Sequence, residues 1–236
     1  MFEFIVNTFD FFLYRPLFNA LVLLYNYIPG HDFGIAVILL TIIIRIVLYP
    51  VAVKSLNSQK VLQKIQPQIQ EIQKKYKNDK EKLAKETLEI YRKEKINPFS
   101  GLFLALVQLP ILIALYRVFW EGLKPSELVN LYNFVLNPVA INANFLGIID
   151  LSKPNTVLAI LSGVLQFFQT KMMLPKISKD KGSAPDFSKM MQKQMLYFFP
   201  VLTVIILLGL PSAIGLYWTV SSIFSIGQQY FLLKKN

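Results

Sequence analysis

Residues 41–50 read TIIIRIVLYP, and they place one arginine, Arg45, inside a run of isoleucine, valine and leucine. A cation at the centre of a bilayer costs about 2.5–3.5 kcal/mol on insertion scales, so charged residues are rare in membrane spans and usually serve a function there. The stretch therefore poses two questions: whether it crosses a membrane, and what group Arg45 meets.

The composition indicates a membrane protein. Of the 236 residues, 54% are hydrophobic and 17% are charged, whereas a soluble domain carries about 25% charged residues. The chain has no Cys and one His, so disulfides, thiolate or histidine metal clusters and cysteine nucleophiles are excluded. The sequence also lacks a nucleotide-binding glycine pattern and a nucleophile–base arrangement. We therefore expect no enzyme activity, no metal, no cofactor and no direct nucleic-acid site.

Five apolar stretches are candidates for membrane-spanning helices. The fourth is short, and Pro211 separates it from the fifth. Pro50, Pro110 and Pro200 lie inside these stretches and predict kinks. The predicted spans are residues 33–54, 97–120, 155–173, 195–210 and 212–233.

The distribution of positive charge predicts the orientation. Most of the 25 Lys and Arg residues lie in 54–100, 171–194 and 234–235, whereas the opposite loops carry only Arg15, Lys124 and Lys153. Because cytoplasmic loops are enriched in Lys and Arg, we expect the N-terminus outside and the C-terminus in the cytoplasm. Residues 121–154 are then an extracytoplasmic loop, 174–194 a cytoplasmic loop and 234–236 a cytoplasmic tail.

Residues 1–32 are predicted to form an amphipathic helical segment in the outer membrane interface. Glu3, Asn7, Asp10 and Tyr14 are spaced by 4, 3 and 4 residues and share one helical face, opposite an apolar face. A sixth span is the alternative, but it would place the basic loops on the wrong side.

Residues 55–96 are highly charged, yet apolar residues recur in them at helical spacing on both sides of Asn78–Asp79. Ile65 and Ile69 belong to the first stripe, and Ala84, Leu88 and Tyr91 to the second. This pattern predicts an antiparallel helical hairpin on the cytoplasmic side. Its basic residues are either a solvated face or a docking arm for a ribosome, a targeting factor or a nascent chain. The docking candidates are Lys74, Lys75, Lys77 and Lys82.

The predicted spans contain no Asp or Glu, so Arg45 has no intramembrane carboxylate in this chain. Neutral polar residues instead form one stripe on each of several spans. They could be interhelical hydrogen-bonding groups, or they could line a wet, positively charged cavity around Arg45, which we favour. Either Gln166 or Gln169 can face it. The candidate groove residues are Arg45, Thr41, Tyr49, Gln108, Gln166, Gln169, Trp218, Ser222 and Gln229.

Four stretches resemble one family: DFGIAVILLTIIIRIVLYPVAVKS (32–55), KIQPQIQEIQKKYKNDKEKLAKE (64–86), INPFSGLFLALVQLPILIALYRVF (96–119) and GLYWTVSSIFSIGQQYFL (215–232). In order and spacing the chain resembles the YidC-type membrane protein insertases, the family of the mitochondrial oxidase-assembly and chloroplast Albino insertases. The resemblance implies a short form without the large extracytoplasmic domain of many Gram-negative members.

The resemblance also implies a fold and a function. The fold is an all-α membrane protein with five transmembrane helices around a groove open to the cytoplasm and to lipid. The function is insertion of nascent membrane proteins into the bacterial cytoplasmic (inner) membrane, with the groove arginine at Arg45. Expected partners are nascent membrane proteins and the lipid bilayer; a ribosome, the signal recognition particle pathway and the Sec translocon are further candidates. A small anion transporter or channel and a passive assembly scaffold are the alternatives.

Overall fold

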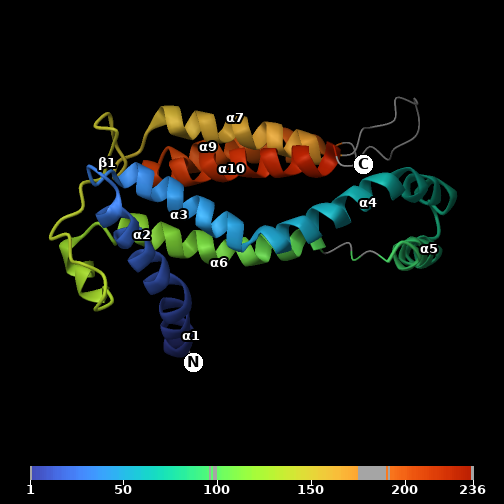
Figure 1. Ribbon diagram of the computed structural model, residues 1–236. Helices are drawn as coiled ribbons and strands as arrows, with labels where there is room; N and C mark the ends of the chain where they lie inside the picture. Colours follow the sequence, from blue (N-terminus) through green and yellow to red (C-terminus); the bar gives the residue numbers. More distant parts are fainter. Residues whose placement is uncertain (1, 96, 98–99, 175–189, 191, 235–236) are drawn as a thin grey trace.

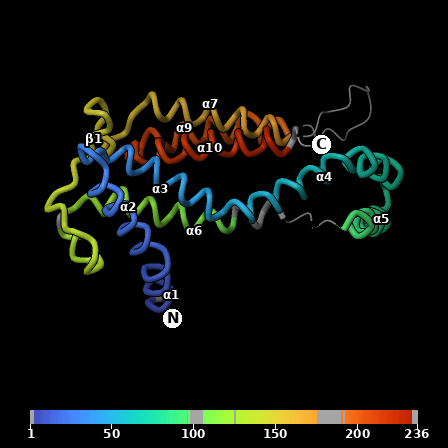
Figure 2. Tube along the Cα trace, viewed as in Figure 1, coloured from blue at the N-terminus to red at the C-terminus, as the bar shows by residue number. Residues whose placement is uncertain are grey.

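The computed structural model describes residues 2–95, 97, 100–174, 190 and 192–234. Its helices form an elongated bundle, from one end of which a helical hairpin projects, and a small pair of strands lies at the other end (Figure 1). We call these the hairpin end and the strand end. The tube view shows the same course, with the chain leaving the bundle toward the hairpin and returning along it (Figure 2). The expected all-α fold therefore holds, apart from two strands of two residues each.

The N-terminal segment is an almost unbroken helical run: α1 (Phe2–Phe9), a π-helical turn η1 (Asp10–Tyr14) and α2 (Arg15–Tyr27). It crosses the bundle at a steep angle, and its N-terminus points away from it (Figure 1). Helix α2 packs on α3 and α6 and buries Phe18 and Leu21. The segment is thus not peripheral throughout, because its second half belongs to the core.

The first predicted span, 33–54, is bent in the structure. Helix α3 (Phe33–Val47) begins at Asp32, whose side chain accepts a hydrogen bond from the backbone N–H of Ile35 at 2.9 Å. After Leu48, α4 (Tyr49–Lys75) continues at 62° to α3. Pro50 explains the break, because proline has no backbone N–H and its ring clashes with the preceding turn. No helix ends at residue 54: α4 runs unbroken from the predicted span into the hairpin.

The hairpin consists of α4 and α5 (Lys80–Lys93), joined by a turn in which the Asp79 side chain caps α5. Ile65 and Ile69 on α4 are buried, as the periodicity predicts. On α5 the expected stripe is wrong at Ala84 and Leu88, which are exposed, but Tyr91 is half-buried as expected. Leu83, Thr87 and Ile90 are half-buried as well. Of the docking candidates, Lys82 pairs with Asp79 at 3.3 Å, Lys75 lies over the Tyr76 ring, and Lys74 and Lys77 are exposed.

The remaining elements follow the expected order. Helix α6 (Ser100–Trp120) leads to a 3₁₀ helix η2 (Pro125–Asn130) and to strands β1 (Asn144–Phe145) and β2 (Ile149–Asp150), which pair antiparallel. Helix α7 (Thr156–Met173) is capped by Asn155 and coincides with the third predicted span. A π-helical turn η3 (Gln194–Phe198), α9 (Phe199–Leu207) and α10 (Ser212–Lys234) complete the bundle. Most of the predicted loop 174–194, and residues 235–236 of the tail, lie outside the described residues.

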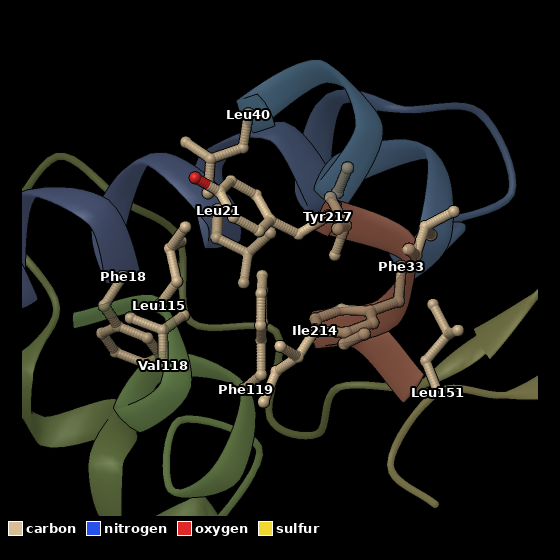
Figure 3. Close-up of a cluster of buried hydrophobic side chains, with 14 of the residues drawn as sticks. Phe18, Leu21, Phe33, Leu40, Leu115, Val118, Phe119, Leu151, Ile214 and Tyr217 are labelled. Atoms are coloured by element: carbon tan, nitrogen blue, oxygen red, sulfur yellow. The ribbon is translucent and has the colours of Figure 1, made fainter. Parts of the chain in front are cut away.

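The hydrophobic core lies in the strand half of the bundle. Side chains from α2, α3, α6 and α10 converge there, with Phe33 and Phe119 in edge-to-face contact at a centroid distance of 6.3 Å (Figure 3). Leu151, which follows β2, closes this cluster from the side of the loop. The core thus ties the loop 121–154 to the helices and leaves the hairpin half of the bundle less filled.

Among the described residues, α7 is the one helix that by itself is long and apolar enough to cross a bilayer. Helices α3 and α4 meet the same requirement together as a bent pair. Leu106–Trp120 and Gln194–Leu207 are apolar but shorter. Helix α10 is long, but buried Ser and Gln side chains lower its hydropathy.

A charged cluster holds the N-terminal segment against the bundle. The Arg117 guanidinium pairs with Asp10 and, at 3.4 Å, with Glu121, and it lies 4.4 Å from the centroid of the Tyr14 ring. The Tyr14 hydroxyl donates to Glu127 at 2.7 Å. Burial, followed by the Glu127 carboxylate, raises the pKa of Tyr14 above its ordinary value. Asp10 and Tyr14, the second half of the predicted polar face, thus contact α6 and the loop, whereas Glu3 and Asn7 are exposed.

Replacing Arg117 with methionine should loosen the N-terminal segment, because Asp10 and Tyr14 lose their cationic neighbour. The pair is about one-third exposed, so we expect a cost of about 1 kcal/mol. Hydrogen exchange of residues 2–14 in detergent should then become about fivefold faster. Arg92→Met, on the exposed part of the hairpin, is the control; equal exchange in both variants would contradict the anchoring role of Arg117.

Candidate functional site

Arg45 lies in the last turn of α3, just before the bend at Leu48. Its side chain is half-buried, and its Nε atom is buried without a hydrogen-bond partner. Among the described residues, no Asp or Glu forms an ion pair with it. A buried cationic group that lacks a protein partner needs water or a ligand group for compensation.

Arg45 lines a cavity of about 200 Å³ between α3, α6, α7 and α10. The wall is mixed: neutral amides and hydroxyls alternate with aromatic rings, and Arg45 is its only charged member among the described residues. A polar cavity of this size has room for several water molecules. The lining residues are Arg45, Gln108, Leu112, Gln166, Gln169, Thr170, Tyr217, Trp218, Ser221 and Ser222.

Six of the nine groove candidates therefore line one cavity, and both Gln166 and Gln169 are among them. The Oε1 atom of Gln166 is buried without a partner, as is Nε of Arg45. Two unpaired polar atoms on one cavity wall favour a hydrated interior, because buried polar groups in native proteins are almost always satisfied by protein or water.

The other three candidates lie elsewhere. Thr41 is buried and its hydroxyl donates to the carbonyl of Val37 at 2.6 Å, so it is used within α3. Tyr49 follows the bend and is 46% exposed, so it does not continue the face of α3 that carries Thr41 and Arg45. Gln229 lies at the hairpin end, beside a small cavity with Lys60 and Gln63.

The cavity also contains Thr170, which lies beside Gln169 in the polar stripe of the third predicted span. Leu112, Tyr217 and Ser221 line it too, and the sequence pattern did not single them out. Tyr217 is 2% exposed, and its hydroxyl accepts a hydrogen bond from Nε2 of Gln108. This bond connects α10 to α6 across the cavity wall. Tyrosine counts as apolar in a hydropathy pattern, so the only signal was its position beside Trp218.

The polar residues of α7 lie in two environments: Ser162 contacts α10, and Gln166 and Gln169 line the cavity. The Ser162 hydroxyl donates to the carbonyls of Leu158 and Gly215, at 2.8 and 2.9 Å, and lies 2.9 Å from the Thr219 hydroxyl. It therefore joins α7 to α10 in a dry contact. One and two turns further along the helix, Gln166 and Gln169 face the cavity instead.

Helix α4 attaches to the hairpin end of the bundle through two polar side chains. Lys60 donates from Nζ to the carbonyl of Leu232, and Gln63 donates from Nε2 to the carbonyl of Met173. These carbonyls belong to the last turns of α10 and α7, which lack intrahelical partners and carry the negative end of the helix dipole. The base of the hairpin thus lies against the ends of two helices that line the cavity.

The sequence matches the family described as "60Kd inner membrane protein" over residues 23–236. The chain belongs to this family. The bundle carries many exposed aliphatic side chains, such as Ile113, Val157 and Ile205, as a membrane protein can.

Several relatives of this chain carry the name "Membrane protein insertase YidC". The chain is 35% identical over 227 residues to the one from Fusobacterium nucleatum, an alignment that covers 95% of this chain and 98% of the relative. It is 35% identical over 236 residues to that of Syntrophus aciditrophicus, covering 97% of this chain but 38% of the relative. For Oceanobacillus iheyensis the identity is 32% over 209 residues, with 87% and 76% covered. The chain thus spans nearly all of one relative and well under half of another.

Proposed function

We propose that this protein is a membrane protein insertase that inserts newly made membrane proteins into the bacterial cytoplasmic membrane. The observation that carries the proposal is the unpaired Arg45 on the wall of a polar cavity. The relatives named as insertases support it.

In this proposal the chain crosses the membrane five times. The spans are α3 with the start of α4, then α6, α7, η3 with α9, and α10. The hairpin end is cytoplasmic and the strand end is outside, which agrees with the enrichment of Lys and Arg in residues 54–100. Arg45 is then in the middle of the membrane, reached from the cytoplasm through a groove whose wall is the polar cavity.

The proposed reaction is physical rather than chemical. A short hydrophilic segment of a substrate enters the cavity from the cytoplasm, which shortens the apolar barrier that remains. Arg45 attracts acidic groups, and Coulomb interactions there are several-fold stronger than in bulk water. The neutral lining, including Gln166 and Gln169, can hydrogen-bond a passing segment without retaining it by charge.

Two driving forces complete the step. Apolar residues of the substrate leave water for lipid, at about 25 cal/mol per Å² of apolar surface. The membrane potential contributes about 2.3 kcal/mol per elementary charge per 100 mV and favours outward movement of acidic segments. The exposed hairpin lysines Lys74 and Lys77 remain candidates for contact with a ribosome, a targeting factor or the Sec translocon.

The proposal predicts that the cavity is wet. Because the chain has no cysteine, Gln166→Cys and Gln169→Cys each introduce a single thiol. We expect membrane-impermeant maleimides to label both from the cytoplasmic side. Ser162→Cys, on the same helix but fully buried, should remain unlabelled, and Lys77→Cys on the hairpin is the positive control. Absence of labelling at both glutamine positions would mean that the cavity is dry.

The function itself is tested by reconstitution. The purified protein is placed in liposomes, a single-span substrate with an acidic translocated segment is synthesised outside them, and insertion is read by protease protection. Protection above that of empty liposomes is expected. Anion flux without protection would support a channel instead, and binding to finished membrane proteins without protection would support a scaffold.

A further inference from the structure

A second cavity, of about 290 Å³, lies on the strand side of the polar one. We call it the apolar chamber. It lies between α6, α9 and α10, and its wall includes Leu112, Tyr116, Thr203, Ile206, Ile214 and Trp218. None of its lining residues carries a charge. Ile206 and Ile113 line it and are more than half exposed, so the chamber opens toward the surroundings of the bundle.

The apolar chamber adjoins the polar cavity, because Leu112 and Trp218 line both. Along α10, the polar cavity extends to Ser222 and the chamber to Ile214, a distance of about 12 Å at ~1.5 Å per residue. Along α6, Gln108 and Tyr116 are separated by the same eight residues. The two neighbouring cavities thus change in character from polar to apolar at the level of Trp218.

We propose that the apolar chamber binds large apolar side chains at the start of a substrate's membrane-spanning segment while the adjoining hydrophilic segment occupies the polar cavity. The inference rests on the proposed function. The chamber is too small for a whole helix, since even small-molecule pockets occupy about 300–1,000 Å³, but it can receive one or two large side chains. The occupant is a substrate rather than a lipid tail because the chamber lies directly beside the cavity that holds Arg45 and shares Leu112 and Trp218 with it.

The geometry assigns a register to the substrate. If the segment is helical, an acidic residue near Arg45 and an apolar side chain in the chamber are one to two turns apart, which corresponds to four to eight residues. Two substrates with equal hydrophobicity but different registers should therefore be inserted at different rates. General partition into lipid would not distinguish them.

Crosslinking tests the occupant. Ile206→Cys and Ile205→Cys are neighbours on α9, and both isoleucines are exposed, but only Ile206 lines the chamber. A substrate with one cysteine, placed four to eight residues from its acidic group, is inserted into liposomes containing either variant. Disulfides are expected with Ile206→Cys and at least severalfold less with Ile205→Cys. Equal yields, or crosslinks from Ile206→Cys to a thiol-reactive lipid tail alone, would overturn the proposal.

Filling the chamber tests its use. Ile206→Trp should lower the insertion rate of a substrate with Phe at the register position by about tenfold, the factor associated with one buried large side chain. It should spare a substrate with Ala at that position, and Ile205→Trp should affect neither. If the wild-type protein inserts both substrates and Ile206→Trp does so equally well, the chamber proposal fails while the insertase function stands. If the wild-type protein inserts neither, the proposed function itself is contradicted.

Discussion

Arg45→Ala is expected to reduce the insertion of substrates with acidic translocated segments by about 10- to 100-fold, since a hydrogen bond to a charged group contributes roughly 1.5–3 kcal/mol. Arg45 is the only charged residue on the described wall of the polar cavity, so no neighbouring cation can replace it. Substrates whose translocated segments are neutral should be inserted nearly as well as by the wild-type protein.

The charge, rather than the shape of the guanidinium, should carry most of the effect. Arg45→Lys keeps one positive charge on a long flexible stem and should retain most of the activity, although it loses the paired donors of arginine. Lys153→Ala is the matched control, because it removes a cation in the loop before α7 that pairs with Asp150 at 2.9 Å and does not line the cavity. Protease protection in proteoliposomes is the measurement. Equal insertion of acidic substrates by Arg45→Ala and the wild type would show that the positive charge is not used.

Part of the candidate site could be predicted from the sequence because polar residues are conspicuous in apolar runs. Gln108, Gln166 and Ser222 stand out in this way, and each lines the cavity with Arg45. Tyr217 was missed because tyrosine is common on apolar helix faces and hydropathy ignores its hydroxyl. In the sequence, Ser162 and Gln166 are both isolated polar residues in an apolar run. Only the packing of α10 against α7 shows that the Ser162 hydroxyl hydrogen-bonds to α10 and does not face the cavity.

The helices could be predicted better than their directions. Helix α7 matches its expected range to within one residue, because its apolar run begins directly after a capping asparagine. Pro50 indicated the bend after Leu48, but the size of the bend depends on what α4 packs against. The bend places Tyr49 and Arg45 on different helices. The burial of α2 could not be inferred from its short apolar run, since it results from packing against α3, the next helix, and against α6, which lies far along the chain.

Gly34→Ala is expected to destabilise the protein by about 1–3 kcal/mol, the usual cost of forcing extra atoms into a packed site. Gly34 lies in the first turn of α3, where strand β1 covers it. A Cβ atom there would lie 2.1 Å from Cδ2 and 2.7 Å from Cβ of Phe145. Rotation of the ring would relieve the first contact but not the second, because the Cβ of Phe145 is fixed to the backbone. The strand pair would therefore have to move away from α3.

A double-mutant cycle isolates this contact. In a Phe145→Gly background the three atoms nearest to the new methyl are absent, so Gly34→Ala should cost much less there or even stabilise α3, given the higher helix propensity of alanine. Gly227→Ala on α10 is the control, since a Cβ at that position meets nothing within 4 Å. The free energy of unfolding in detergent micelles is the measurement. Equal destabilisation by Gly34→Ala in both backgrounds would mean that the close approach of β1 to α3 is not what requires glycine at this position.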